Sequence, residues 1–383
     1  MQKKINMKKI LVLGAGMVGK AIAVDLCKNN KVTSVDLDQN ALKMLTDNYP
    51  VQTRTFNVTD NKALSELVSD FDFVISAVPG HLGYETLKTI IEAGKDVVDI
   101  SFMPEDFMDL KEAAASKGVT AIADCGVAPG MPNLIAGYYN EKMKIESLEY
   151  VVGGLPKERR YPFYYKAPFS PVDVIEEYTR PARYKENDKI LVKPAMSDVE
   201  MMEFDKVGTL EAFFTDGLRS LLDTLDKIPN MKEKTLRYPG HIELMKILKK
   251  AGFFSDNPVS VNNTEMSPLD FTSKILIDNW KLEPDEHEFT VMRIIIDGLL
   301  DNKEKRITYE LYDEYDTVTA LSSMARTTGF TATACAELVL EGIFDKKGVY
   351  PLELIGAHEE AFFFIIDYLK ERNVIYNKKV TDI

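Results

Sequence analysis

The sequence predicts an α/β protein in which an N-terminal, doubly wound parallel sheet precedes a second, α+β domain with a mixed or antiparallel sheet. Three observations support this prediction. Four apolar residues at positions 10–13 run into the motif Gly-x-Gly-x-x-Gly and a helical apolar pattern. Short apolar strands and helical segments then alternate as far as about residue 140. Beyond residue 146 the pattern changes to strands that follow one another as hairpins.

The glycine motif consists of Gly14, Gly16 and Gly19, and the helix that follows begins near Met17 and Val18. In a strand-turn-helix unit of this kind, the first glycine makes the tight turn and the second lets the backbone approach a pyrophosphate. The third lets the helix pack on the strand. The helix N-terminus presents unpaired N–H groups to the phosphates. The first domain is therefore predicted to be a dinucleotide-binding Rossmann domain; the alternative is a tight turn in which the glycines occur by chance.

A second predicted strand, at residues 32–35, ends at Asp36. A carboxylate at this place accepts hydrogen bonds from both ribose hydroxyls and repels a 2′-phosphate, so the predicted cofactor is NAD. Lys31 and Gln39 leave NADP open as the alternative.

A third predicted strand, at residues 51–56, leads to Val58. Rossmann domains commonly contact the adenine ring in this segment, so we expect Val58 to bind the cofactor. Thr59 or Asp60 can instead serve only to cap the next helix.

The fourth predicted strand, at residues 71–76, opens into Ala77, Val78 and Pro79. Ligands of open α/β sheets bind outside the carboxyl ends of the strands. We therefore expect these three residues to line the path of the nicotinamide ribose.

Two more strand-helix units complete the first domain, with strands at residues 96–101 and 119–124. The second of these strands ends in Asp124 and a Gly/Pro-rich loop at residues 125–133, which we expect to shape the backbone around the nicotinamide ring. Asp124 either orients the amine or the nicotinamide carboxamide, or caps the loop.

The second domain is predicted from a change of pattern. Its expected elements are a strand at residues 147–152, a helix at 241–250, and hairpin strands at 289–296 and 305–315. A last long helix, at about 331–340, is expected to return to the first domain. The predicted domains are a Rossmann domain (1–140), an α+β substrate-binding and dimerisation domain (141–325), and a C-terminal helical segment (326–383).

Composition excludes several classes of partner. The formal net charge of −13 over 383 residues argues against nucleic acid or an anionic membrane, since binding phosphates needs a basic face. Three widely spaced cysteines make neither a disulfide framework nor a metal site, so we expect no metal and a reducing, cytoplasmic location. No stretch is apolar enough to span a bilayer.

Several motifs resemble the saccharopine dehydrogenase family over nearly the whole chain. They lie at residues 124–133 (DCGVAPGMPN), 152–156 (VGGLP), 215–219 (TDGLR), 236–241 (LRYPGH) and 324–329 (MARTTG). The resemblance implies a Rossmann domain, an inserted mixed-sheet domain, and oxidation of a C–N bond by a nicotinamide cofactor. His241 at the end of its motif resembles the lysine 6-dehydrogenase branch, which oxidises the ε-amine of L-lysine to a cyclising semialdehyde and releases ammonia.

The chemistry of amine oxidation requires a group that accepts the ammonium proton, because hydride leaves only the carbon of a neutral amine. His241 is the first candidate, since the turn before it presents it at a helix start, where the dipole favours the neutral ring. Lys166, in an aromatic stretch, is the second, and Asp124 is the third. Each also has a structural alternative: a capping or surface histidine, a solvated lysine, and a turn-capping carboxylate.

An amino-acid substrate also needs a fixed cation for its carboxylate, and arginine offers a planar fork for both oxygens. Arg219 and Arg237 lie on connections beside turns, and with Tyr238 they are the predicted substrate-binding residues. We favour them over Arg180 and Arg183, which can instead stabilise a loop.

Alternatives remain within and outside this enzyme class. One is oxidation of a secondary amine, as in saccharopine or carboxynorspermidine dehydrogenases, which a larger and more cationic pocket would favour. Another is a non-catalytic NAD-binding sensor. The expected partners are a small amino acid or amine and further copies of the chain, as a homodimer or higher homo-oligomer.

Overall fold

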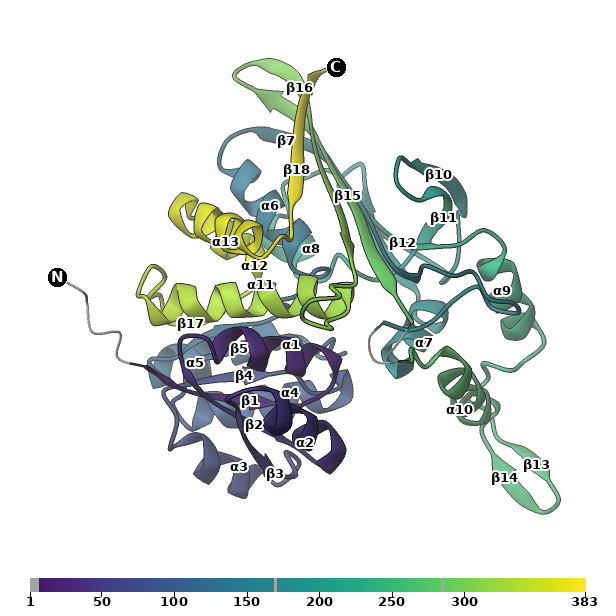
Figure 1. Cartoon of the computed structure of the whole chain (residues 1–383). Coiled ribbons are helices and arrows are strands. Elements are labelled where there is room, and N and C mark those ends of the chain that lie inside the picture. The colour runs from purple at the N-terminus through teal and green to yellow at the C-terminus, as the bar shows by residue number, and fades with distance from the viewer. Residues whose placement is uncertain (1–6, 169–170, 284–285) are drawn as a thin grey trace. The chain divides into compact units, whose positions relative to one another are not determined.

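The computed structural model describes residues 7–168, 171–283 and 286–383. Within these residues the chain forms two units, each built around a sheet of its own (Figure 1). Unit 1 comprises Met1–Met143 and Met324–Ile375, and unit 2 comprises Lys144–Ser323 and Tyr376–Ile383. The chain therefore leaves unit 1, builds most of unit 2, returns to unit 1 and ends in unit 2.

Unit 1 contains a parallel sheet that, over the described residues, has seven strands in the order β17-β6-β5-β4-β1-β2-β3. The strands are β1 (Lys9–Leu13), β2 (Lys31–Asp36), β3 (Gln52–Thr55), β4 (Phe73–Ser76), β5 (Val97–Asp99), β6 (Thr120–Ile122) and β17 (Gly348–Tyr350). The strand order reverses between β1 and β4, which is the switch point where such sheets bind ligands. The predicted doubly wound sheet is confirmed.

Helices connect these strands, as parallel pairing requires. They are α1 (Met17–Leu26), α2 (Gln39–Asn48), α3 (Asn61–Val68), α4 (Gly80–Glu92), η1 (Phe107–Leu110), α5 (Lys111–Lys117) and α6 (Met131–Asn140). Local signals set two of the helix starts. The Asp38 carboxylate accepts hydrogen bonds from the first N–H groups of α2, and the Asp60 carboxylate accepts one from Ala63 in α3.

The returning C-terminal segment supplies α11 (Ser323–Leu340), β17, α12 (Leu352–Gly356) and α13 (Glu359–Glu371). A C-terminal helical segment at 326–383 was predicted, and the structure adds two strands to its helices. Strand β17 extends the parallel sheet beside β6, and β18 (Tyr376–Asp382) pairs with a strand of unit 2. Both segments are short, and neither has the clear alternation that identifies a strand from sequence.

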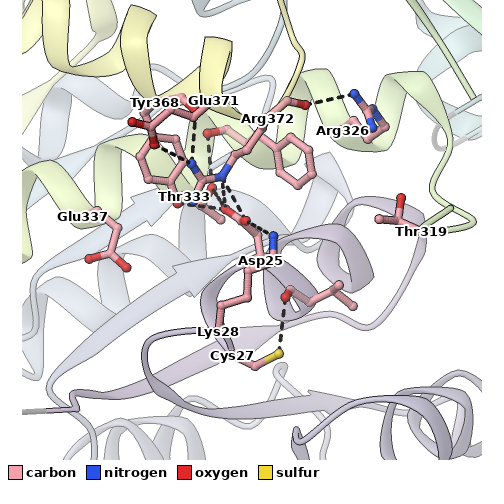
Figure 2. A network of polar contacts seen from close by, with 12 residues as sticks. Asp25, Cys27, Lys28, Thr319, Arg326, Thr333, Glu337, Tyr368, Glu371 and Arg372 are labelled. Carbon is pink, nitrogen blue, oxygen red and sulfur yellow. Dashed lines mark hydrogen bonds and ion pairs between the residues drawn. The ribbon is translucent and has the colours of Figure 1, made fainter. Parts of the chain in front are cut away.

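The C-terminal helices are joined to α1 by hydrogen bonds that converge on Asp25 (Figure 2). The Asp25 carboxylate accepts from Tyr368 of α13, from Arg372 directly after that helix and from Thr333 of α11, and it pairs with Lys28. Its side chain is completely buried. Residues more than 300 positions apart in sequence are thus held together by one charged group.

Unit 2 contains a mixed sheet, nine-stranded over the part of the chain that is described. Its main order is β10-β11-β12-β7-β15-β16-β18, with β8 and β9 attached beside β12. The strands are β7 (Lys144–Pro156), β8 (Ala182–Glu186), β9 (Lys189–Lys193), β10 (Glu200–Phe204), β11 (Gly208–Phe214), β12 (Asn230–Arg237), β15 (Glu288–Leu300), β16 (Lys303–Glu314) and β18. Strands β7 and β12 run parallel, while β15 and β16 form the predicted hairpin.

The core of unit 2 lies between this sheet and its helices, α7 (Pro171–Thr179), α9 (His241–Lys250) and α10 (Pro268–Trp280). A short helix, α8 (Leu221–Thr224), and a separate hairpin of β13 (Val259–Val261) and β14 (Thr264–Met266) complete the unit. Because β7 and β12 are parallel neighbours, their carboxyl ends, Pro156 and Arg237, lie at the same end of the sheet. Two of the family motifs identified above therefore come together there.

Candidate functional site

The glycine turn after β1 has the geometry of a dinucleotide site. Gly14 has φ +103°, and its N–H donates to Val35 O at 2.8 Å. A Cβ on Gly14 would lie 2.4 Å from Ala77 O, and one on Gly19 would lie 2.2 Å from Gly14 O, so neither position accepts a side chain. At Gly16, by contrast, a Cβ would have no atom within 4 Å. The space before Gly16, at the start of α1, is open for a pyrophosphate.

Helix α1 begins with Met17 and Val18, and its cap residue, Gly16, provides no side-chain acceptor. The first N–H groups of a helix lack partners within the helix, so a bound phosphate can accept from them. These residues thus fit a dinucleotide on the structure's own geometry.

Asp36 ends β2 beside the glycine turn. Its carboxylate accepts from Ala15 N–H at 2.6 Å and from Asp38 N–H at 2.9 Å. Lys31 is the first residue of the same strand, so it lies about 16 Å from Asp36 at 3.3 Å per residue. It pairs in register with Lys9, at the amino ends of β1 and β2. Gln39 is the first residue of α2 and carries no charge. The position of Lys31 removes one of the two arguments for NADP.

The residues after β3 and β4 lie at the same carboxyl edge. Ala77 donates to Leu13 O at 2.8 Å, which holds it beside the glycine turn. Val78 is buried, and Pro79 is exposed as the cap of α4. Val58 is half-buried, while Asp60 caps α3 as the structural alternative stated. The structure therefore brings Ala77, and not Asp60, to the nucleotide turn.

The loop after β6 is shaped by Gly130, where a Cβ would overlap Gly126 O at 1.8 Å. Asp124, which opens this loop, has φ +52° and is almost completely buried. Asp99, at the end of the neighbouring strand β5, was missed by the sequence analysis. Burial raises the pKa of Asp99 to about 7, and Ser101 donates to it. Cys125 N–H donates to Asp99 O at 3.1 Å, which places the two acids side by side.

Arg237, predicted to bind the substrate carboxylate, is only 2% exposed, and all three of its guanidinium nitrogens have partners within unit 2. Its guanidinium pairs with Glu177, donates to Tyr178 Oη at 2.9 Å and donates to Leu236 O at 2.9 Å. It also lies over the Tyr165 ring, 4.3 Å from the centroid. Arg237 therefore serves the packing of unit 2 and has no donor turned to solvent.

His241, predicted to accept the substrate proton, is completely buried. Its Nδ1 lies 2.7 Å from Phe163 O, so this nitrogen carries the proton and Nε2 accepts from Tyr178 Oη at 2.9 Å. Burial and the nearby Arg237 charge lower the pKa of His241 to about 3. The ring is neutral, as predicted, but because of burial rather than the helix dipole. Both nitrogens are occupied, which favours a structural role.

Lys166 and Arg219 are also held within unit 2. Lys166 Nζ donates to Lys281 O at 3.0 Å and lies 3.4 Å from the Glu286 carboxylate. Arg219 has φ +47° just before α8 and is 9% exposed. The arginines ranked below it, Arg180 and Arg183, are paired with Glu176 and Asp216.

Tyr238 lies at the carboxyl ends of β7 and β12. Its hydroxyl donates to Pro156 O at 2.8 Å, and its ring is 4% exposed. The guanidinium of Arg159 covers this ring, with its Cζ 4.1 Å from the centroid. Arg159 was not selected from the sequence, because nothing local distinguishes it from its neighbour Arg160.

Two classes of site were also sought across the structure. The described residues contain no group of three or more His, Cys, Asp or Glu side chains that could hold a metal ion. No helix in the described part of the chain combines the length and the apolar character that crossing a bilayer requires.

Comparison with known structures shows the same fold. The apo saccharopine dehydrogenase (L-Glu forming) of Saccharomyces cerevisiae superposes with a TM-score of 0.80. The match covers 98% of this chain and 100% of that chain, at 21% identity. At this identity the likeness establishes the fold alone.

Curated relatives match over 65% to 98% of this chain. The mitochondrial alpha-aminoadipic semialdehyde synthase of Rattus norvegicus is 24% identical over 98% of this chain and 48% of its own length. The saccharopine dehydrogenase [NADP(+), L-glutamate-forming] of Saccharomyces cerevisiae is 25% identical over 65% of this chain and 59% of its own. The chain thus spans about half the length of the curated relatives it matches.

Two domain families cover nearly the whole chain. The saccharopine dehydrogenase NADP binding domain matches residues 10–122, and the saccharopine dehydrogenase C-terminal domain matches residues 126–375. The glycine turn, the loop at residues 124–133 and the paired ends of β7 and β12 all lie within these matches. The chain belongs to the saccharopine dehydrogenase family.

Proposed function

We propose that this chain is a pyridine-nucleotide-dependent dehydrogenase that oxidises a C–N bond of an amino-acid substrate. The observation that carries the proposal is the glycine turn of unit 1, where the space before Gly16 is open and Asp36 lies beside it. Family membership supports the same reaction class, since the relatives above are named as a saccharopine dehydrogenase and a semialdehyde synthase. When bound, the cofactor accepts a hydride from the carbon that carries the amine.

NAD is the cofactor that the residues of this chain favour, although the yeast relative is named for NADP. Asp36 and Asp38 place two carboxylates at the ribose end of the turn, which repel a 2′-phosphate. We expect a lower Michaelis constant for NAD than for NADP. Substituting Asp36→Asn should narrow that difference; equal use of both cofactors by the wild-type protein would contradict the assignment.

Asp124 and Asp99 are the residues that we propose for proton transfer in unit 1. They follow neighbouring strands at the carboxyl edge, where open α/β sheets bind ligands. A carboxyl whose pKa is raised to about 7, as at Asp99, exchanges protons efficiently near neutral pH. His241 would act differently, by fixing Tyr178 and the end of β12.

L-Lysine is the substrate that we place first, by oxidative deamination of its ε-amine to the semialdehyde with release of ammonia. Most cations near the motif-bearing end of the unit 2 sheet are neutralised by acids: Lys157 by Glu314, Arg160 by Glu286, and Arg237 by Glu177. A substrate with one carboxylate requires fewer unpaired cations than one with three. The NAD preference also separates this chain from its NADP-named relative.

Saccharopine is the second candidate, because the yeast relative is named for it. The residue that resembled the lysine enzymes, His241, is buried in unit 2 and so does not distinguish between the substrates. Carboxynorspermidine, another secondary amine, is a third possibility to assay.

The deciding experiment is NADH formation by the purified protein with NAD and, separately, L-lysine, L-saccharopine, carboxynorspermidine and 1,5-diaminopentane. Turnover of L-lysine with stoichiometric ammonia would support the first candidate. Turnover of saccharopine without ammonia would replace it with the second. Tight NAD binding without turnover of any amine would contradict the enzyme proposal and leave the sensor alternative.

We also propose that the protein works as a homodimer or higher homo-oligomer in the cytoplasm. Strand β18 is an edge of the unit 2 sheet and is largely exposed, so its backbone can pair with another copy. Light scattering of the purified protein tests this, and a monomer at micromolar concentration would contradict it.

A further inference from the structure

We infer that Arg159 is the cation that binds the substrate carboxylate. The inference rests on the proposed function and deepens it, because it names the part of the substrate that unit 2 recognises. It replaces the sequence-based choice of Arg237, whose donors are consumed within the core.

Among the described residues, Arg159 differs from six of the other seven arginines of unit 2 by its lack of an ion pair, and from the seventh, Arg219, which is only 9% exposed, by its exposure. Ion pairs with carboxylates neutralise Arg160, Arg180, Arg183, Arg237, Arg293 and Arg306. Within the described ranges, no carboxylate lies at ion-pair distance from Arg159, which is exposed to solvent. Its charge is therefore available to a ligand anion.

The guanidinium of Arg159 is nevertheless fixed in place. It stacks on the buried ring of Tyr238, and that ring is anchored by the hydrogen bond from its hydroxyl to Pro156 O at 2.8 Å. Tyr238 also packs edge-on against Phe289, with 6.4 Å between ring centroids. The contact with the ring holds the guanidinium near Tyr238, and a planar guanidinium that is exposed to solvent can bind both oxygens of a carboxylate.

The backbone on both sides of Arg159 is also held. Lys157 N–H donates to His287 O at 2.9 Å, and Tyr164 N–H donates to Arg160 O at 2.8 Å. The side chain of Lys157 pairs with Glu314. The side chain of Arg160 pairs with Glu158 and Glu286. Arg159 thus lies between Lys157 and Arg160, whose charges are paired. Because its backbone is held, Arg159 loses little conformational entropy when it binds an anion.

The test compares two substrates that differ in the carboxylate: L-lysine and 1,5-diaminopentane, its counterpart without that group. In Arg159→Met, the Michaelis constant for L-lysine should rise about 10- to 100-fold, because a charge-assisted hydrogen-bonded pair is lost. The Michaelis constant for 1,5-diaminopentane should stay within about twofold of the wild-type value, because this substrate has no carboxylate for Arg159 to bind. Arg159→Lys should be intermediate, because it retains the charge but loses the planar fork.

Arg160→Met is the matched control, because it removes an adjacent exposed arginine whose charge is already paired with Glu286. It should leave the Michaelis constant for L-lysine close to the wild-type value. Circular dichroism of each variant establishes that it is folded. Unchanged L-lysine kinetics in folded Arg159→Met would overturn the inference, as would an equal rise for both substrates.

Failure of the proposed function can be told apart from failure of this inference. If the wild-type protein oxidises no amine, calorimetric binding of L-norleucine, which has the carboxylate but no ε-amine, replaces the kinetic measurement. Binding by the wild type and Arg160→Met but not by Arg159→Met would sustain the inference. Equal binding by all three, or binding by none, would overturn it.

Discussion

A buried ionic network lies in each unit, and the two networks are built in opposite ways. In unit 1 the centre is an anion: Asp25 accepts from Arg372 at 2.8 Å, Tyr368 at 2.8 Å and Thr333 at 2.8 Å (Figure 2). In unit 2 the centre is a cation: Arg237 pairs with Glu177 and donates to Tyr178, which in turn donates to His241. In the first network several donors bind one acceptor, Asp25. In the second the hydrogen bonds form a chain from Arg237 through Tyr178 to His241.

The titration of the buried groups reflects this difference. Burial alone would raise the pKa of Asp25, but the Arg372 charge and the converging donors bring it below its usual value. Burial and the charge of Arg237 instead lower the pKa of His241 to about 3, which leaves a neutral ring at the end of the chain of bonds. An anion can therefore be buried when several donors meet it, while a cation is stabilised here by one acid and by neutral neighbours.

The largest effect is expected for Arg237→Met. This change leaves the largely buried Glu177 carboxyl, whose side chain is 19% exposed, without its cation, and breaking a buried pair costs about 3–5 kcal/mol. Chemical denaturation should show unit 2 unfolding first. A loss below about 1 kcal/mol would mean that Glu177 is readily protonated or rehydrated, and the contrast between the networks would fail.

A smaller loss, about 2–3 kcal/mol, is expected for Asp25→Asn, since hydrogen bonds to charged groups are worth about 1.5–3 kcal/mol. The substituted amide keeps an oxygen that can accept from Tyr368 and Thr333. Of the two cations left without an ion pair, Lys28 is 58% exposed, and Arg372 is 16% exposed, close to the 19% of Glu177. Both can regain water. A loss equal to that of Arg237→Met, measured in the same denaturation series, would show that an anionic centre is no easier to replace.

The pH dependence of stability gives a third comparison. The pKa of His241 is about 3 in the folded protein and 6.5 unperturbed, so the unfolded chain binds an extra proton between these values. Stability therefore falls as pH decreases from 6.5 towards 3, by up to about 1.4 kcal/mol per pH unit. In His241→Asn the unfolded chain no longer takes up this extra proton, so the slope of stability against pH should fall by up to about 1.4 kcal/mol per pH unit.

The control for that measurement is His81→Asn, since His81 is exposed on α4. Stability is measured by urea denaturation at pH 7, 6 and 5. An unchanged slope in His241→Asn would contradict the neutral, buried state assigned to this ring.

The smallest effects are expected from removing one hydroxyl from each network. Tyr178→Phe breaks the hydroxyl bridge between Arg237 and His241, leaves His241 Nε2 unsatisfied among the described residues, and should cost about 1–3 kcal/mol. Tyr368→Phe removes one of several donors to Asp25 and should cost about 0.5–1.5 kcal/mol. Equal losses in thermal unfolding would show that convergence of donors provides no redundancy.

The sequence predicted the nucleotide turn well because its determinants are local. Gly19 meets Gly14 five residues earlier, and Gly14 meets Ala77 at the end of the neighbouring strand β4. Asp38 caps α2 two residues after Asp36. The hairpin of β15 and β16 was also predicted, since its strands are adjacent in sequence. Such signals are readable without knowledge of the tertiary fold.

The roles of the charged residues in unit 2 were not predictable in the same way. His241 and Arg237 have the residue types expected of a catalytic site, but the structure buries both and occupies their polar atoms. No local sequence pattern distinguishes Arg159 from Arg160. Whether its charge is free to bind a ligand depends on which acids from distant segments pair with it or with its neighbours. Ion pairing between segments more than 100 residues apart, such as Arg160 with Glu286, is decided only when the sheet assembles.

The sequence by itself therefore determined the parallel sheet, the glycine turn, the acid at the end of β2 and the second, mixed-sheet domain. These features follow from hydrophobic periodicity and from backbone requirements that act over a few residues. Only the tertiary structure decided that β17 and β18 complete two different sheets, that His241 is a neutral core residue, and that no acid of the described residues pairs with Arg159. Burial and charge pairing depend on which distant segments meet, and that information lies in the folded chain as a whole.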